Sequence, residues 1–298
     1  MVSRALVGLS LMAACVLSAC GGGQEPLPDT PYSPNAKYGP DTLQSVTLHE
    51  PAGPSRGLAV WIHGGGWVWG DKDDDVPVFA DVVAQGIAVL NMNYRLGPTG
   101  AFPKSVDDVK QVLAAAQGGL CAECDNPQLW SRVRSHAAHG GIMVAGASAG
   151  GYLSVYGAPE AIRANPAGPI KCIVGQVPPV DFRPLEAYSK YVLDTFLSVY
   201  ADGDLSPAKL ATMSPAYQLE QGAWSDAMSR KWYLLYSTRD DYIPFATTAG
   251  FSTGLRAAGA DLKQLDIVST ELPGAHNLET RHVIEHLAAS AKDCFGPN

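Results

Sequence analysis

The sequence predicts an α/β domain built on a doubly wound, mostly parallel sheet, and two observations support this prediction. Short apolar runs rich in β-branched residues recur along the chain, with helix-like stretches between them. These runs are apolar at nearly every position, which is typical of strands buried on both faces of a parallel sheet. The 298 residues allow one large domain, and no internal repeat or second linker divides them.

The expected elements alternate in chain order. Strands are expected at 58–62, 87–92, 142–145, 170–175, 232–236 and 262–268. Helices are expected at 76–85, 105–117, 150–158, 247–258 and 278–291. Residues 44–49 alternate more strongly, as an antiparallel edge strand does, whereas residues 181–225 have no strand pattern and are expected to form a helical or irregular insertion.

Residues 1–19 have the pattern of a signal peptide. Arg4 precedes an apolar stretch, residues 5–17, that is too short to cross a bilayer. The stretch ends in LSAC, which resembles the lipobox of bacterial lipoproteins and implies cleavage before Cys20 and lipid attachment to it; an ordinary secretory signal is the alternative. Residues 20–41 are expected to form a Gly/Pro-rich tether that links a membrane-anchored, exported domain (42–298) to the cell envelope.

Charge and cysteine content limit the partners and the compartment. With 21 Lys and Arg against 29 Asp and Glu, the formal net charge is −8, and no basic cluster is present, which argues against a nucleic-acid partner. Besides Cys20, the exported chain would keep four cysteines in an oxidising compartment, and four cysteines allow three pairings. Cys121 and Cys124 could close a short loop and leave Cys172 with Cys294.

The segment GASAGG, residues 146–151, follows one expected strand and opens the next helix. A G-x-S-x-G pattern in this setting is typical of a nucleophile elbow, in which Ser148 sits on a strained turn between small neighbours. The start of the helix favours the negative charge that develops beside the serine. Ser148 is the predicted nucleophile; the alternative is a glycine-rich turn with an incidental serine.

The run HGGGW, residues 63–67, ends an earlier strand. Consecutive glycines let backbone N–H groups converge on an anionic oxygen, and this pattern accompanies the elbow in lipases and esterases. We expect the oxyanion hole to consist of Gly65, Gly66 and the amide of Ala149, and His63 to anchor the loop. A phosphate-binding loop would need a G-x-G-x-x-G spacing or a P-loop lysine, and neither is present.

With these motifs the chain resembles α/β-hydrolases of the carboxylesterase kind, near the feruloyl-esterase-like and kynurenine-formamidase-like branches. The resemblance covers roughly residues 42–291 and rests on HGGGWVWGDK (63–72), NYRLGP (93–98) with FPKSVDDV (102–109), GASAGG (146–151) and SPA (214–216). It implies an α/β-hydrolase fold in which residues 181–225 form a cap, and a triad in the chain order Ser, acid, His.

The resemblance places the acid after strand 232–236 and the base in the loop before the last helix. Asp240 is the expected acid, Asp241 is the runner-up, and Asp181 is less favoured. His276 is the expected base, which takes the serine proton while the carboxylate holds its tautomer.

Other histidines are expected to have structural places. His136 and His139 are expected in a surface turn. His282 and His286 form an H-x-x-E-H pattern that also occurs in zinc proteases, but no segment for a downstream ligand follows, so we expect the polar side of a helix. No metal and no cofactor are predicted.

Aromatic residues gather near the expected site. Trp67 and Trp69 lie beside the glycine loop and Tyr152 follows the elbow, so that Trp67 and Tyr152 are the predicted substrate contacts; core packing is the alternative. The insertion adds Phe182, Tyr188, Tyr191 and Phe196. The sequence thus predicts a serine esterase that cleaves small-molecule carboxylic esters through an acyl-enzyme. An amidase such as an arylformamidase and a non-catalytic hydrolase-like binding protein are the alternatives.

Overall fold

The computed structural model describes residues 35–267, 276 and 280–296 of the chain. The predicted signal peptide, Cys20 and most of the predicted tether lie outside the described residues. Among the described residues, no helix combines the length and the apolar character needed to cross a bilayer.

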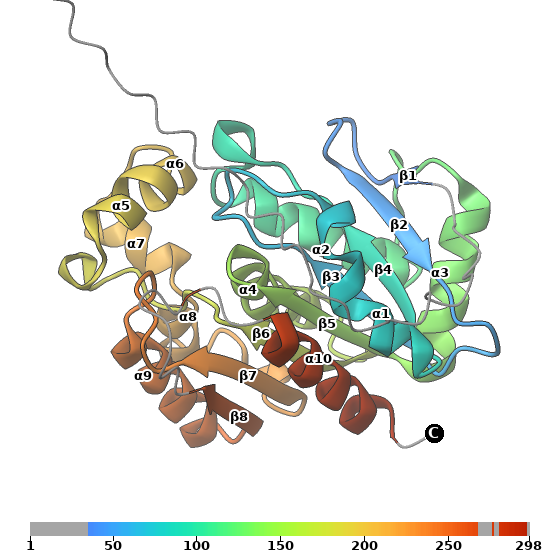
Figure 1. Cartoon of the computed structure of the whole chain (residues 1–298). Coiled ribbons are helices and arrows are strands. Elements are labelled where there is room, and N and C mark those ends of the chain that lie inside the picture. Colours follow the sequence, from blue (N-terminus) through green and yellow to red (C-terminus); the bar gives the residue numbers. More distant parts are fainter. Residues whose placement is uncertain (1–34, 268–275, 277–279, 297–298) are drawn as a thin grey trace, which may run out of the picture.

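One eight-stranded sheet forms the centre of the described body (Figure 1). Its strands lie in the order β1-β2-β4-β3-β5-β6-β7-β8. The β1–β2 and β2–β4 pairs are antiparallel and the other five pairs are parallel, which confirms the predicted mostly parallel sheet. The strands are β1 (Ala36–Lys37), β2 (Ser45–His49), β3 (Leu58–Ile62), β4 (Ala88–Met92), β5 (Ile142–Ala147), β6 (Ile170–Gln176), β7 (Lys231–Ser237) and β8 (Asp261–Ile267).

Helices cover both faces of this sheet, which explains why the central strands are apolar at most positions. All five residues of β3 are buried: Val60 and Ile62 face the core beneath α2 and α4, whereas Trp61 faces α1 and α10. Helices α1 and α10 lie side by side on their face (Figure 1). The helices are α1 (Val76–Ala84), α2 (Lys104–Ala116), α3 (Pro127–Gly140), α4 (Ala149–Ala164), α5 (Lys190–Val192), α6 (Ser198–Tyr200), α7 (Pro207–Met213), α8 (Pro215–Glu220), α9 (Phe245–Ala257) and α10 (Thr280–Phe295).

The insertion between β6 and β7 consists of short helices and turns without a strand, as predicted. Helices α5, α6 and α7 lie together at one end of the sheet, on the left of Figure 1. Between α5 and α6 the chain forms a π-helical turn at Leu193–Leu197. Such turns are rare in proteins, and many of those that occur lie at functional sites. Here the turn brings Phe196 against the glycine loop described below.

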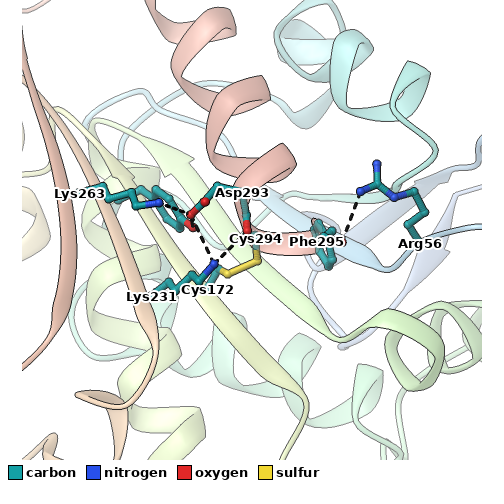
Figure 2. The surroundings of a disulfide bond; sticks show 8 residues. Arg56, Cys172, Lys231, Lys263, Asp293, Cys294 and Phe295 are labelled. Atoms are coloured by element: carbon teal, nitrogen blue, oxygen red, sulfur yellow. Dashed lines mark hydrogen bonds and ion pairs between the residues drawn. A yellow bond between two sulfur atoms is a disulfide. The ribbon is translucent and has the colours of Figure 1, made fainter. Parts of the chain in front are cut away.

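Two disulfides form among the described residues, Cys121–Cys124 and Cys172–Cys294, and they match the pairing that the short loop suggested. Cys172 lies on β6 and Cys294 near the end of α10, so the second disulfide fixes this helix to the sheet (Figure 2).

Two predictions at the N-terminal boundary were wrong. β2 is antiparallel as expected, but it is not the edge strand, because β1 pairs along its outer side. β1 falls within residues 20–41, which were assigned to the tether. Tyr38, which is fully buried, donates its hydroxyl to the Asn93 carbonyl at 2.6 Å, so the folded body already includes this segment. Its Gly/Pro-rich composition hid a strand of only two residues.

Helix α3 was not predicted. It carries His136 and His139, which were expected in a surface turn. The side chain of Asn126 accepts a hydrogen bond from the Leu129 amide at 3.1 Å, and Pro127 opens the first turn. An N-cap asparagine followed by proline is a helix-start signal, and this pair would have located the helix.

Candidate active site

The turn from β5 into α4 holds Ser148 in a strained conformation. Ser148 has φ 53° and ψ −119°, a region that non-glycine residues seldom adopt. Its amide donates to the Gln176 carbonyl of β6 at 2.8 Å. The neighbouring glycine is required, because a Cβ on Gly150 would lie 2.0 Å from the carbonyl oxygen of Ile62. The β5–α4 turn therefore has the geometry expected of a nucleophile elbow.

A chain of hydrogen bonds joins the three predicted triad residues. Ser148 Oγ lies 2.8 Å from His276 Nε2. On the other side of the ring, His276 Nδ1 lies 2.9 Å and 3.1 Å from the two carboxylate oxygens of Asp240. The side chains of His276 and Asp240 are only 9% and 4% exposed, so this pair is shielded from water. In this arrangement Nδ1–H donates to the carboxylate and Nε2 can accept the serine proton.

The structure also separates Asp240 from the other two candidate acids. Asp240 lies in the loop after β7, where its Oδ1 accepts hydrogen bonds from the Tyr242 and Ile243 amides at 2.9 and 2.8 Å. Asp241 Oδ1 instead accepts from the backbone amide of His276 at 3.1 Å. Asp181 forms an ion pair with Arg183 at 2.7 Å. Asp240 alone of these three contacts the ring.

The glycine loop after β3 packs against Ser148. A Cβ on Gly64 would lie 3.6 Å from the Cβ of Ser148, and Gly66, at φ 60°, lies so close to Phe196 that a Cβ there would clash. Within the described residues, the amides of Gly65, Gly66 and Ala149 donate to no backbone carbonyl. These three predicted donors therefore remain available to an oxyanion.

His63 anchors this loop, as predicted. Its Nδ1–H donates to the Gly64 carbonyl at 2.6 Å, and its ring stacks on Tyr94 at 4.5 Å. Burial lowers the pKa of His63 and favours the neutral ring, although the hydrogen bond to the Gly64 carbonyl acts in the opposite direction. The backbone amide of Lys72 donates to Asn93 Oδ1 at 2.6 Å. This hydrogen bond joins the end of the HGGGWVWGDK motif to the start of the NYRLGP motif.

A cavity of about 540 Å³ opens onto Ser148 and His276. The glycine loop and the insertion form one part of its wall, and β3, α1 and α10 form another. Besides Ser148 and His276, the residues that line it include Trp61, Gly65, Gly66, Trp67, Trp69, Asp75, Val78, Phe182, Tyr188, Tyr191, Phe196, Tyr242 and Val283.

One of the two predicted substrate contacts was wrong. Trp67 lines the cavity, and so do Trp69 and the aromatic residues predicted in the insertion. Tyr152 does not; it is fully buried, and its hydroxyl donates to the Met213 carbonyl at 2.9 Å. Position 152 is one turn into α4, where the side chain points into the core rather than toward the serine. It supports the cavity indirectly, through an edge contact with Trp67 at 5.3 Å.

Sequence reasoning missed two residues beside the site. The ring of Tyr242 stacks on the imidazole of His276 at 4.8 Å, and its place directly after the two aspartates was the available signal. Asp75 lines the cavity, although it looked like one of several charges in an acidic run.

The H-x-x-E-H segment lies on α10, but His286 is not on a polar face. His286 is buried, and its Nδ1 accepts a hydrogen bond from Gln176 Nε2 at 3.1 Å. Burial lowers the pKa of His286 to about 4. The residue is thus a neutral component of the packing between α10 and β6.

The chain belongs to the alpha/beta hydrolase fold family, whose model matches residues 59–222, more than half of the chain. Among curated proteins, it is 26% identical over 254 residues to Esterase LipC and 24% identical over 264 residues to Esterase LipQ, both from Mycobacterium tuberculosis. These matches cover 80% and 84% of this chain but only 57% and 56% of the two esterases. A shorter match, 29% over 142 residues, covers 46% of this chain and 16% of the FAD-linked oxidoreductase pytB of Aspergillus terreus.

Solved structures share the fold. The esterase LipW from Mycobacterium marinum superposes with a TM-score of 0.64 at 21% identity, covering 85% of this chain and 78% of that one. One of two esterases from Rhizomucor miehei gives a TM-score of 0.63 at 20% identity, with 84% and 79% covered. At these identities, the likeness extends to the α/β-hydrolase fold, as the sequence predicted.

Proposed function

We propose that this protein is a serine esterase that cleaves carboxylic esters of small molecules through an acyl-enzyme. One observation carries the proposal: the hydrogen-bonded chain from Ser148 through His276 to Asp240 ends at a cavity of about 540 Å³. The esterases among its relatives agree with this activity. A binding protein would have no need of a shielded imidazole and a strained serine at the cavity wall.

In the proposed reaction, Ser148 Oγ attacks the ester carbonyl carbon while His276 Nε2 takes its proton. Asp240 holds the ring and stabilises the imidazolium. The amides of Gly65, Gly66 and Ala149 would donate to the oxyanion of the tetrahedral intermediate. His276 then protonates the departing alcohol, and water hydrolyses the acyl-enzyme by the same route, so that no cofactor enters the reaction.

Fluorophosphonate labelling tests the nucleophile. We expect the wild-type protein to be labelled and the Ser148→Ala variant not to be labelled; an unlabelled wild-type protein would contradict the proposal. Aryl acetates, methyl ferulate and N-formylkynurenine then separate ester from amide substrates. Faster turnover of N-formylkynurenine would favour an arylformamidase instead.

We further propose that the mature protein is exported and anchored in the cell envelope through acylated Cys20. The LSAC sequence before the Gly-rich segment supports this proposal. Two or three acyl chains on one residue hold a protein firmly to a bilayer. Mass spectrometry of the mature N-terminus should find acyl groups on Cys20, and Cys20→Ala should move the protein to the soluble fraction. An unmodified N-terminus produced by cleavage at another site would contradict the anchor.

A further inference from the structure

We propose that Asp75 forms a cation-binding subsite in the catalytic cavity, so that the preferred substrates are esters that carry an ammonium group. This inference rests on the proposed esterase function and specifies its substrate class. The observations concern the partners of Asp75, the charges around it and the chemistry of the cavity wall.

The side chain of Asp75 faces β3 rather than the start of α1. Asp75 is the last residue of the 3₁₀ turn Lys72–Asp75, which runs directly into α1, and the start of this joint helix is capped by Asp71. The Oδ2 of Asp75 accepts a hydrogen bond from Trp61 Nε1 at 2.9 Å. Among the described residues, Oδ1 has no hydrogen-bond partner, which leaves this oxygen to a ligand in the cavity.

The negative charge of Asp75 has no basic partner in the described structure. Lys72, the nearest basic residue in the sequence, pairs with Asp73 at 2.8 Å. No lysine or arginine occurs among the described residues that line the cavity. Burial raises the pKa of Asp75 to about 6, and the neighbouring charge of Asp74 adds to this, so the carboxylate is ionised but uncompensated at pH 8.

The residues around Asp75 suit a ligand that has an ammonium group attached to an apolar portion. The end of the cavity near Asp75 is otherwise formed by Trp61, Val78 and Val283, from the core beneath α1 and α10. A carboxylate in an apolar wall attracts a cation strongly, because little water screens the pair, and it repels an anionic substrate.

The experiment measures binding to a Ser148→Ala protein at pH 8, so its result does not depend on catalysis. The probes are 2-phenylethylammonium, 2-phenylethanol and phenylacetate, which share a ring and differ in charge. We expect the cation to bind at least roughly tenfold more tightly than the alcohol, as one charge-assisted hydrogen bond would give, and the anion to bind most weakly. Equal binding of the three probes, or no binding of the cation, would overturn the proposal.

Two added variants test whether Asp75 causes the preference for the cation. Asp75→Asn keeps an acceptor for Trp61 Nε1 but removes the charge, so the preference for the cation should disappear. Asp81→Asn, on the exposed side of α1, removes the same charge outside the cavity and should leave the preference unchanged. A preference that survives Asp75→Asn would contradict the assignment. If Asp75→Asn failed to fold, the three-probe comparison on the Ser148→Ala protein would still test the proposal, because equal binding of the three probes would overturn it.

Discussion

Breaking the Cys172–Cys294 disulfide should lower the free energy of unfolding far more than breaking Cys121–Cys124. A crosslink stabilises a fold mainly by restricting the unfolded chain, and the restriction grows with the length of the closed loop. The chain-entropy relation gives about 5 kcal/mol for the 122-residue separation and about 2 kcal/mol for the 3-residue one. Because whole domains are stable by only about 5–15 kcal/mol, the first value is a large share of the total.

The native contacts around the long-range disulfide support attributing this loss to the unfolded state. Asp293, the neighbour of Cys294, accepts hydrogen bonds from Lys231 at 3.0 Å through its carbonyl and from Lys263 at 2.6 Å through its carboxylate (Figure 2). Arg56 donates to the Phe295 carbonyl at 3.3 Å. These contacts do not depend on the sulfur–sulfur bond, so the end of α10 should stay in place when the bond is absent.

Urea unfolding of three proteins tests this prediction: the wild type, Cys121→Ala/Cys124→Ala and Cys172→Ala/Cys294→Ala. Since the alanine at 172 also leaves a small cavity, the sharper comparison uses Cys121→Ala/Cys124→Ala with its remaining disulfide oxidised and then reduced, which removes the bond without removing any side-chain heavy atom. The midpoint should fall markedly on reduction. If reduction left the midpoint unchanged, or if the 121/124 pair cost more than the 172/294 pair, the loop-entropy argument would be refuted.

Three further predictions follow from the site and from α10. Asp240→Asn should lower kcat on p-nitrophenyl acetate by roughly 10⁴-fold, whereas Asp241→Asn should change it less than about tenfold, since only Asp240 contacts the imidazole; steady-state kinetics compare them. Tyr242→Leu, which removes the ring stacked on His276, should lower kcat/KM roughly threefold to tenfold, and an unchanged kcat/KM would count against a role for that contact. Burial holds the pKa of His286 at about 4 against an ordinary 6.5, so between these pH values the unfolded chain binds a proton that the folded chain does not. As the pH falls from 7 to 4, the wild type should therefore lose up to about 3 kcal/mol more stability than His286→Gln in urea titrations.

The parts of the site that the sequence predicted are those fixed by local backbone geometry. The turn at Ser148 and the loop at Gly65 and Gly66 need small residues at fixed offsets, because a Cβ would collide with backbone or neighbouring rings. Such a requirement is visible in a few adjacent letters. The acid and the base followed from chain order in the family resemblance, and the structure brings Asp240 and His276 to the predicted contact.

The sequence did not predict which side chains face the core and which face the cavity, because contacts between residues far apart in the chain decide this. Tyr152 and Trp67 are both aromatic and both adjacent to a motif, but only the packing of α4 against the insertion decides that Tyr152 is core and Trp67 is cavity wall. His286 was expected on the polar side of the last helix. Its position on α10 instead meets Gln176 of β6, a residue 110 positions away in the chain.

Asp75 shows why specificity was harder to predict than chemistry. In the sequence it ends the run Lys72–Asp75, and only the folded structure distinguishes it from its charged neighbours, because there it contacts Trp61, 14 positions away, and lines the cavity. Ser148 and His276 line the same cavity as residues of the insertion and of β3, α1 and α10. Among the described lining residues, aromatic side chains dominate the wall from the insertion, and Asp75 is the one carboxylate of the other wall. Ring size and charge in a substrate should therefore be selected independently, so replacements at Phe196 should alter the preference for bulky groups without changing the preference for cations that Asp75 confers.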